Sequence, residues 1–159
     1  MSEAQNQPVF SIEKIYVKDI SLEVPNAPQV FLEREAPTVD IQLHHNSGAV
    51  EEGVYQTTLT VTVTAKVKDK TMFLVEASQA GIFQVRNIPP QELDPVLGIA
   101  CPNILFPYVR ETISDIVTRA GFPPVVLNPV NFEAIYSAQR ESQVAQQPAV
   151  QIITPTVSH

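Results

Sequence analysis

The hydrophobic pattern of residues 55–67 predicts a β-strand with one apolar and one polar face. The apolar positions are Tyr55, Leu59, Val61, Val63, Ala65 and Val67, and the polar ones are Gln56, Thr58, Thr60, Thr62, Thr64 and Lys66. Strict alternation of this kind, rich in β-branched residues, is typical of an antiparallel sheet with one face on the core and one toward solvent.

Three further segments alternate in the same way. Residues 10–24 place Phe10, Ile12, Tyr16, Ile20 and Leu22 on one face and Asp19, Ser21 and Glu23 on the other, before a break at residues 25–28. Residues 39–43 predict a shorter strand that ends at the turn-forming residues 46–48. A hairpin turn at residues 68–70 leads to a return strand over residues 72–85. The sequence therefore predicts four strands before any helix.

The second half of the chain has helical spacing. Residues 101–120 carry an apolar stripe, with Pro102 near the start and Gly121 after the last turn. Residues 90–97 predict a short helix that Pro95 interrupts. Asn131 is a suitable N-cap for a last helix that turns Phe132, Ile135 and Tyr136 inward.

Strands followed by helices predict an α+β fold: a four-stranded antiparallel sheet with one long helix and shorter helices after it. We expect a flexible N-terminus over residues 1–8, a single domain over residues 9–141 and a mobile tail over residues 142–159. Long strands with so few helices leave apolar surface uncovered. An oligomer is therefore expected.

Composition limits the classes of partner. The 159-residue chain has a formal net charge of −7, which argues against nucleic acid and favours a protein partner with a basic segment. A single cysteine cannot form an internal disulfide, and the first residues do not resemble a signal peptide. No apolar run is long enough to insert into a membrane, so we expect a cytoplasmic protein.

The sequence offers no catalytic or metal-binding constellation. Cys101 has no histidine nearby in the predicted elements, and the adjacent His44 and His45 point to opposite faces of a strand. The glycines form no phosphate-binding loop. We therefore expect no catalytic residue, no metal and no cofactor, although an acyl-transfer enzyme that uses Cys101 stays open to test.

Two surfaces stand out, and each has two interpretations. Asp19 and Glu23 share one strand face, and Leu74 and Glu76 share another. These four residues form either an ordinary solvent-facing sheet or a docking surface with Leu74 as its apolar anchor. The apolar connector after the long helix, near Phe31, Tyr108 and Phe122, either packs on the core or walls an exposed groove.

Four segments closely resemble SecB, the bacterial protein-export chaperone family. They are IYVKDISLEVPNAPQVF (residues 15–31), FLVEASQAGIF (73–83), CPNILFPYVRE (101–111) and GFPPVVLNPVNF (121–132). The resemblance implies a homotetramer, built as a dimer of dimers. It also implies an ATP-independent holdase that binds unfolded preproteins, keeps them competent for translocation and delivers them to the SecA motor.

The resemblance also assigns roles to residues. It implies SecA docking at Asp19, Glu23, Leu74 and Glu76, and an effect on subunit association at Val75, Ala77 and Gln79. The implied client groove comprises Phe31, Val39, Ile41, Leu43, Tyr108, Phe122, Val125, Leu127, Phe132 and Tyr136. Glu35 departs from the family, in which many members have tryptophan there. A carrier of small apolar ligands, using the same groove, is the main alternative function.

Overall fold

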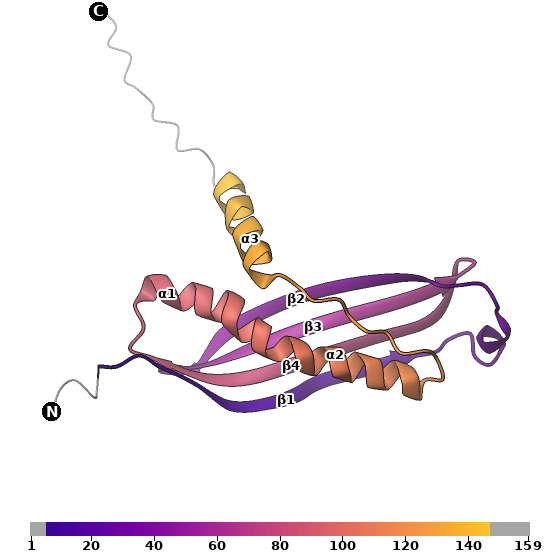
Figure 1. The fold of residues 1–159 in the computed structure, drawn as a ribbon, viewed down its shortest axis with the longest axis horizontal. Coiled ribbons are helices and arrows are strands. Elements are labelled where there is room, and N and C mark those ends of the chain that lie inside the picture. The colour runs from indigo at the N-terminus through magenta and orange to yellow at the C-terminus, as the bar shows by residue number, and fades with distance from the viewer. Residues whose placement is uncertain (1–5, 147–159) are drawn as a thin grey trace, which may run out of the picture.

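The structure is a computed structural model that describes residues 6–146, and it has the predicted α+β architecture (Figure 1). The strands are β1 (Val9–Glu23), β2 (Thr38–Glu51), β3 (Val54–Val67) and β4 (Lys70–Arg86), with a 3₁₀ turn, η1 (Gln29–Leu32), between the first two. The helical segments are α1 (Pro90–Pro95), the π-helical η2 (Val96–Ala100), α2 (Cys101–Arg119) and α3 (Phe132–Gln146). All the strands of this sheet precede the helices, which confirms the predicted fold class.

The four strands form one antiparallel sheet in the order β1-β4-β3-β2. Strands β2, β3 and β4 follow one another as hairpins, and β1 returns to the sheet beside β4. Val67 pairs directly with Lys70, so Lys68 and Asp69 alone make the predicted turn, both with positive φ. Two residues in this conformation match the right-handed twist of the flanking strands.

The predicted faces of β1 are partly wrong, because the strand is irregular at two places. Its register with β4 shifts between Ile12 and Lys14 and again between Val17 and Asp19. Each shift inserts one residue and reverses the alternation that follows. Tyr16 therefore lies on the face away from α2, where its hydroxyl donates to the side-chain oxygen of Gln56.

Strand β2 is longer than predicted, because its backbone pairs with β3 through the turn-forming residues. Asn46, Ser47 and Gly48 pair with Thr58, Thr57 and Gln56, and the strand continues to Glu51. The prediction that it ends at residues 46–48 is wrong. Ladder hydrogen bonds to a neighbouring strand outweigh the weak β-propensity of these side chains.

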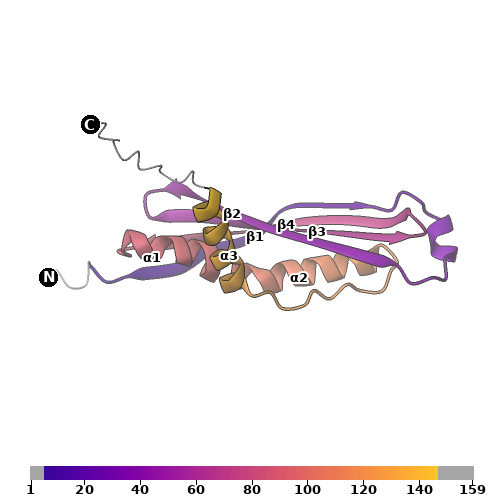
Figure 2. The same ribbon diagram turned by 90° about the horizontal axis from the view of Figure 1, so that it is seen from above.

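The core lies between α2 and one face of the sheet, and Figure 2 shows the helices as a layer on that side. This inner face contributes Leu59, Val61 and Val63 from β3, together with Phe73, Val75 and Ala77 from β4, all of them buried. From α2 come Leu105, Val109, Ile113 and Val117, at the predicted helical spacing. The threonine face of β3 is the outer face.

The helices after β4 run on without a break, which differs from the two separate helices expected. The backbone N–H of Cys101 donates to the carbonyl of Val96, five residues back, and makes η2 a π-turn. Pro102 follows at once and has no N–H for the ordinary bond to Gly98. The π-turn therefore accommodates the proline within a continuous helix.

Helix α3 begins as predicted, since the side-chain oxygen of Asn131 accepts a bond of 3.0 Å from the N–H of Ala134. Phe132 is buried, and Ile135 and Tyr136 are partly buried. The helix continues to Gln146, into the segment expected to be a tail. The rest of that predicted tail, like residues 1–5, lies outside the described residues.

Candidate functional site

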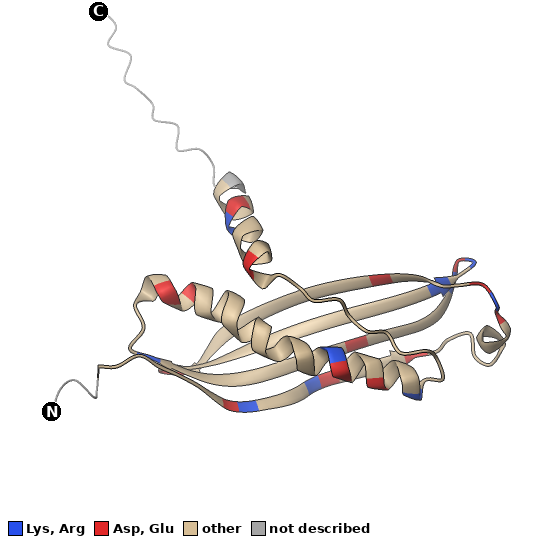
Figure 3. Ribbon diagram, viewed as in Figure 1, with Lys and Arg blue, Asp and Glu red and all other residues tan. Residues whose placement is uncertain are grey.

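The structure brings Asp19, Glu23, Leu74 and Glu76 together on the outer face of the sheet, and we call this set the acidic face. Glu23 pairs directly with Leu74 across β1 and β4, and Glu76 pairs with Ser21. Asp19 pairs with Ser78, two residues further along β4. Figure 3 shows acidic positions, in red, on the neighbouring strands β1 and β4. Two strands distant in sequence therefore build one surface with three carboxylates around an apolar side chain.

A neighbouring strand orients one of these carboxylates. The hydroxyl of Thr62 on β3 donates to Oε2 of Glu76 at 2.9 Å. Glu76 and Leu74 are partly buried, whereas Asp19 and Glu23 are exposed. A carboxylate held by one hydrogen bond keeps its remaining lone pairs for a cationic partner. The acidic face is therefore suited to a basic element of another protein.

The connector between α2 and α3, residues 121–131, is anchored at its start by an aromatic cluster. Phe122 packs on Phe73 of β4 with a centroid distance of 4.9 Å and stacks on Phe31 at 5.0 Å. Phe73 pairs with Ala65, and Ala65 pairs with Val39. The start of the connector therefore packs on the cross-strand row of the sheet that ends at Val39.

The other end of the connector is anchored further along β2. Phe132 meets the ring of His45 edge-on at 6.1 Å and that of Phe106 at 6.0 Å. Because Val39 and His45 lie on one face of β2, the connector runs beside this strand from one anchor to the other. Figures 1 and 2 show it in the helical layer, passing from the end of α2 toward β2.

The residues expected in the client groove fall into two groups. Val39 and Ile41 are 42% and 47% exposed, Phe31 is 49% exposed, and Leu43, Val125 and Tyr136 are partly buried. Phe122, Leu127 and Phe132 are buried and belong to the core beneath the connector. We call the surface formed by Val39, Ile41 and Leu43, with Phe31 and Val125 beside it, the apolar strip.

Tyr108 is not gathered with the apolar strip, although it is exposed. The depression between α2 and the connector is lined by Pro107, Arg110, Ser114 and Val126, among others, and Tyr108 is absent from it. At helical spacing Tyr108 lies next to Glu111 and Asp115, which do line this depression.

Val75, Ala77 and Gln79 lie beneath α2 and are buried. The amide of Gln79 donates to the backbone oxygen of Tyr16 at 3.1 Å and so links β4 to β1. These residues do not reach the surface of the subunit. Any effect of theirs on association would act through the position of α2 or β1.

Cys101 is poorly suited to nucleophilic chemistry. Burial raises the pKa of its thiol to about 11, and a hydrogen bond with Thr57 opposes this shift only in part. The thiolate is the reactive form, and it is scarce at neutral pH when the pKa is this high. Within residues 6–146, no three His, Cys, Asp or Glu side chains cluster as metal ligands would.

Two features were not anticipated from the sequence. Glu35 and Glu33 both approach Nζ of Lys68, at 3.7 and 3.5 Å, so Glu35 joins an ion-pair cluster at the β3–β4 turn. A polar cavity of about 260 Å³ lies between β2, η2 and α3. Its residues come from three elements far apart in sequence, so no local motif could reveal it.

No helix in residues 6–146 combines the length and hydropathy needed to span a bilayer.

Comparisons with known proteins agree with this geometry. A family model described as "Preprotein translocase subunit SecB" matches residues 3–143. The chain is 61% identical to the protein-export protein SecB of Nitrosospira multiformis, over 97% of this chain and 99% of that protein. It is 67% identical to the corresponding protein of Chromobacterium violaceum, over 90% and 96% of the two chains.

A solved structure shares the fold. A SecB-like chaperone of Mycobacterium tuberculosis, in complex with a peptide from an antitoxin, superimposes with a TM-score of 0.64. The two chains are 17% identical, and the match covers 76% of this chain and 90% of that one. At this identity the likeness establishes the fold, while the family follows from the sequence matches. This chain belongs to the SecB family of preprotein translocase subunits.

Proposed function

We propose that this protein is a cytoplasmic, ATP-independent holdase that binds extended segments of unfolded preproteins and delivers them to the SecA motor. The exposure of Val39 and Ile41 on the inner face of β2 carries the proposal. Apolar side chains on the core side of a sheet are ordinarily covered, and here they flank an apolar connector. Such uncovered apolar surface is typical of a binding site.

The physics of this surface fits a holdase. Burial of apolar area contributes roughly 25 cal/mol per Å² whatever the client sequence, so the site would tolerate many clients. Binding only unfolded chains shifts a client away from its folded state by mass action, without nucleotide hydrolysis. Each strip alone would bind weakly. Strips joined in one assembly would raise the avidity by about 10²- to 10⁴-fold.

Self-association would supply that assembly, and β1 offers the surface for it. Ile12, Val17 and Ile20 lie on the inner face of β1, where α2, which packs chiefly on β4 and β3, leaves them exposed. Strand β1 is also an edge of the sheet, with backbone groups free to pair. A homotetramer built as a dimer of dimers, as in the family, would cover these residues.

The acidic face would serve the second step, which is delivery. Its carboxylates and Leu74 lie on the outer face of the sheet, whereas the apolar strip lies on the inner face. A bound client would therefore leave the acidic face open to SecA. Steering of a basic element toward the carboxylates would act within a Debye length of about 8 Å at physiological salt.

One pair of variants tests capture and delivery separately. Replacing Ile41 and Leu43 together by serine should weaken binding of a denatured client at least about tenfold, because apolar burial is lost. Glu76→Lys should abolish SecA binding and leave client binding unchanged. Titration measures client binding and SecA binding for each variant, and native mass measurement checks that the assembly is intact. Val50→Ser changes a more exposed apolar residue of β2 outside the strip, and it should leave both client and SecA binding unaltered.

Unchanged client capture by the Ile41→Ser/Leu43→Ser protein would refute the role of the strip. Equal loss of client and SecA binding in Glu76→Lys would refute the separation of the two surfaces. Saturable binding of a fluorescent fatty acid at one site per chain, without protection of a denatured protein, would instead indicate a carrier of small apolar ligands.

A further inference from the structure

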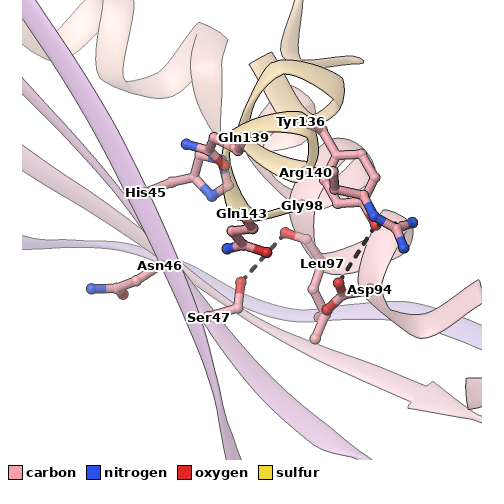
Figure 4. Close-up of a pocket in the computed structure, with 10 residues that line it drawn as sticks. All are labelled: His45, Asn46, Ser47, Asp94, Leu97, Gly98, Tyr136, Gln139, Arg140 and Gln143. Atoms are coloured by element: carbon pink, nitrogen blue, oxygen red, sulfur yellow. Dashed lines mark hydrogen bonds between the residues drawn. The ribbon is translucent and has the colours of Figure 1, made fainter. Parts of the chain in front are cut away.

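The polar cavity between β2, η2 and α3 is a second candidate binding surface, which we call the polar wedge. Its defining residues are His45 and Ser47 on β2 and Gln139 and Gln143 on α3, and Asp94, Gly98, Tyr136 and Arg140 line its far side. Figure 4 shows the side chains of His45, Ser47, Gln139 and Gln143 extending into the space between strand and helix. Asn46 points away from it.

Several hydrogen-bonding groups of the wedge lack a good partner. Nε2 of His45 is buried and has none. The side chains of Gln139 and Gln143 are exposed, and within the described part of the chain their amides form no hydrogen bond to protein groups. Ser47, by contrast, already pairs with the hydroxyl of Thr57 at 2.7 Å, and its oxygen lies 3.4 Å from the carbonyl of Leu97. Buried polar groups are ordinarily satisfied, so the unpaired Nε2 of His45, with two free amides facing it, gives the wedge capacity for a ligand.

The wedge continues the apolar strip along the same strand. The inner-face positions of β2 run Val39, Ile41, Leu43, His45 and Ser47, as their pairing with β3 shows. The face thus changes from apolar to polar between Leu43 and His45. Phe132, which contacts His45, ends the connector and begins α3. An extended chain lying on the strip would enter the wedge without a change of direction.

The position of α3 over the wedge depends on a close contact with η2. A Cβ added to Gly98 would lie 2.7 Å from the ring of Tyr136, so only glycine lets this ring pack there. The hydroxyl of Tyr136 donates to Asp94 at 3.5 Å, and the guanidinium of Arg140 lies 5.7 Å from the centre of its ring. These contacts place Gln139 and Gln143 opposite β2.

We propose that the polar wedge binds the main chain of the client segment whose apolar side chains lie on the apolar strip. The inference rests on the proposed function. Neutral amides donate and accept at once, as a peptide group does, so they match a main chain better than a charged ligand. An extended client loses water from its backbone on binding, and its N–H and C=O groups need new partners.

The test uses the full chain in its native assembly and a short fluorescent preprotein peptide. The peptide is compared with versions N-methylated on every backbone amide of its N-terminal or its C-terminal half. We expect Gln139→Ala/Gln143→Ala to bind the unmodified peptide about 3- to 10-fold more weakly, as expected for one or two lost hydrogen bonds. Methylation of the half that occupies the wedge should abolish this difference between variant and parent.

Gln91→Ala makes the same chemical change on exposed α1, outside the wedge, and should bind every peptide like the parent. Two results of the titration would overturn the inference: unchanged affinity in the double variant, or an equal loss of affinity for all the peptides. A change in native mass would also overturn it, because the wedge would then belong to a subunit interface. None of these results touches the proposed function, which stands or falls with Ile41 and Leu43.

Discussion

His45 illustrates how the setting of a single residue changes its chemistry. Its neighbour His44 faces the outer side of the sheet, while the ring of His45 lies against Phe132 on the inner side. Burial lowers the pKa of His45 below 6.5, and the nearby His44 lowers it further. Its ring is therefore neutral in the folded protein at neutral pH, with one nitrogen lacking a partner.

This shift predicts acid lability. Between the folded-state pKa and 6.5, the unfolded chain binds a proton at His45 more readily than the folded chain does. Stability therefore falls as the pH drops below about 6.5, and the loss is complete below the folded-state pKa. When the pH falls from about 7.5 to about 5.5, the free energy of unfolding of the His45→Gln protein should decrease less than that of the parent. Urea midpoints at one protein concentration measure this.

The effect of His45 should stay well under about 1.4 kcal/mol, the value of one full pKa unit, because its ring is partly solvated. Contributions from groups remote from His45 are common to both proteins and cancel in the comparison. Identical pH dependence in the two proteins would contradict the prediction.

At the scale of elements, the contact between α2 and β4 determines where the helical layer lies. Gly81 of β4 is buried under the helix, and a Cβ there would lie 2.7 Å from the ring of Phe83 and 3.0 Å from Leu105. Val75, Ala77 and Gln79 share this buried surface. A larger side chain at one of these positions of β4 would push α2 away from the sheet and disturb the connector that follows α2.

Gly81→Ala should accordingly destabilise the protein by about 1–3 kcal/mol through overpacking. Gly48→Ala is the matched control, because a Cβ on Gly48 would meet nothing within 4 Å. It should change stability by less than about 0.5 kcal/mol. Denaturant unfolding measures both, and equal stability of the two variants would show that α2 tolerates the extra methyl group.

For the whole molecule, the decisive feature is that apolar surface is left on both edges of the sheet. The exposed inner face of β1 is suited to a second copy of the chain, and that of β2 to a client. The acidic face lies on the opposite side of the sheet from both. Assembly, capture and delivery would therefore use separate surfaces of one small subunit.

Charges on the inner face of β1 should break the assembly. Val17→Lys/Ile20→Lys buries two ammonium groups in the inferred interface, so the native mass should fall to that of a smaller species. Client affinity should fall with it, as avidity is lost. Leu32→Lys, an exposed apolar residue on η1, should keep the parent mass. Full assembly of the double variant would place the interface elsewhere.

Much of this architecture follows from the sequence alone, because its signals are local. Alternating threonines predict β3, Lys68 and Asp69 predict the turn, and Asn131 predicts the start of α3. Each depends on backbone and side-chain preferences within a few residues. Even spacing also placed Asp19 with Glu23 and Leu74 with Glu76 on their strand faces, but only the pairing of β1 with β4 joined them into the acidic face.

Tertiary structure alone decided the rest, because burial and register depend on neighbours distant in sequence. The irregularities of β1 moved Tyr16 to the other face, and pairing with β3 carried β2 past Gly48. Connector residues of similar hydropathy divided into buried Leu127 and exposed Val126. The polar wedge exists only where β2, η2 and α3 meet. Sequence determined which side chains each element presents, and packing determined which of them were left uncovered.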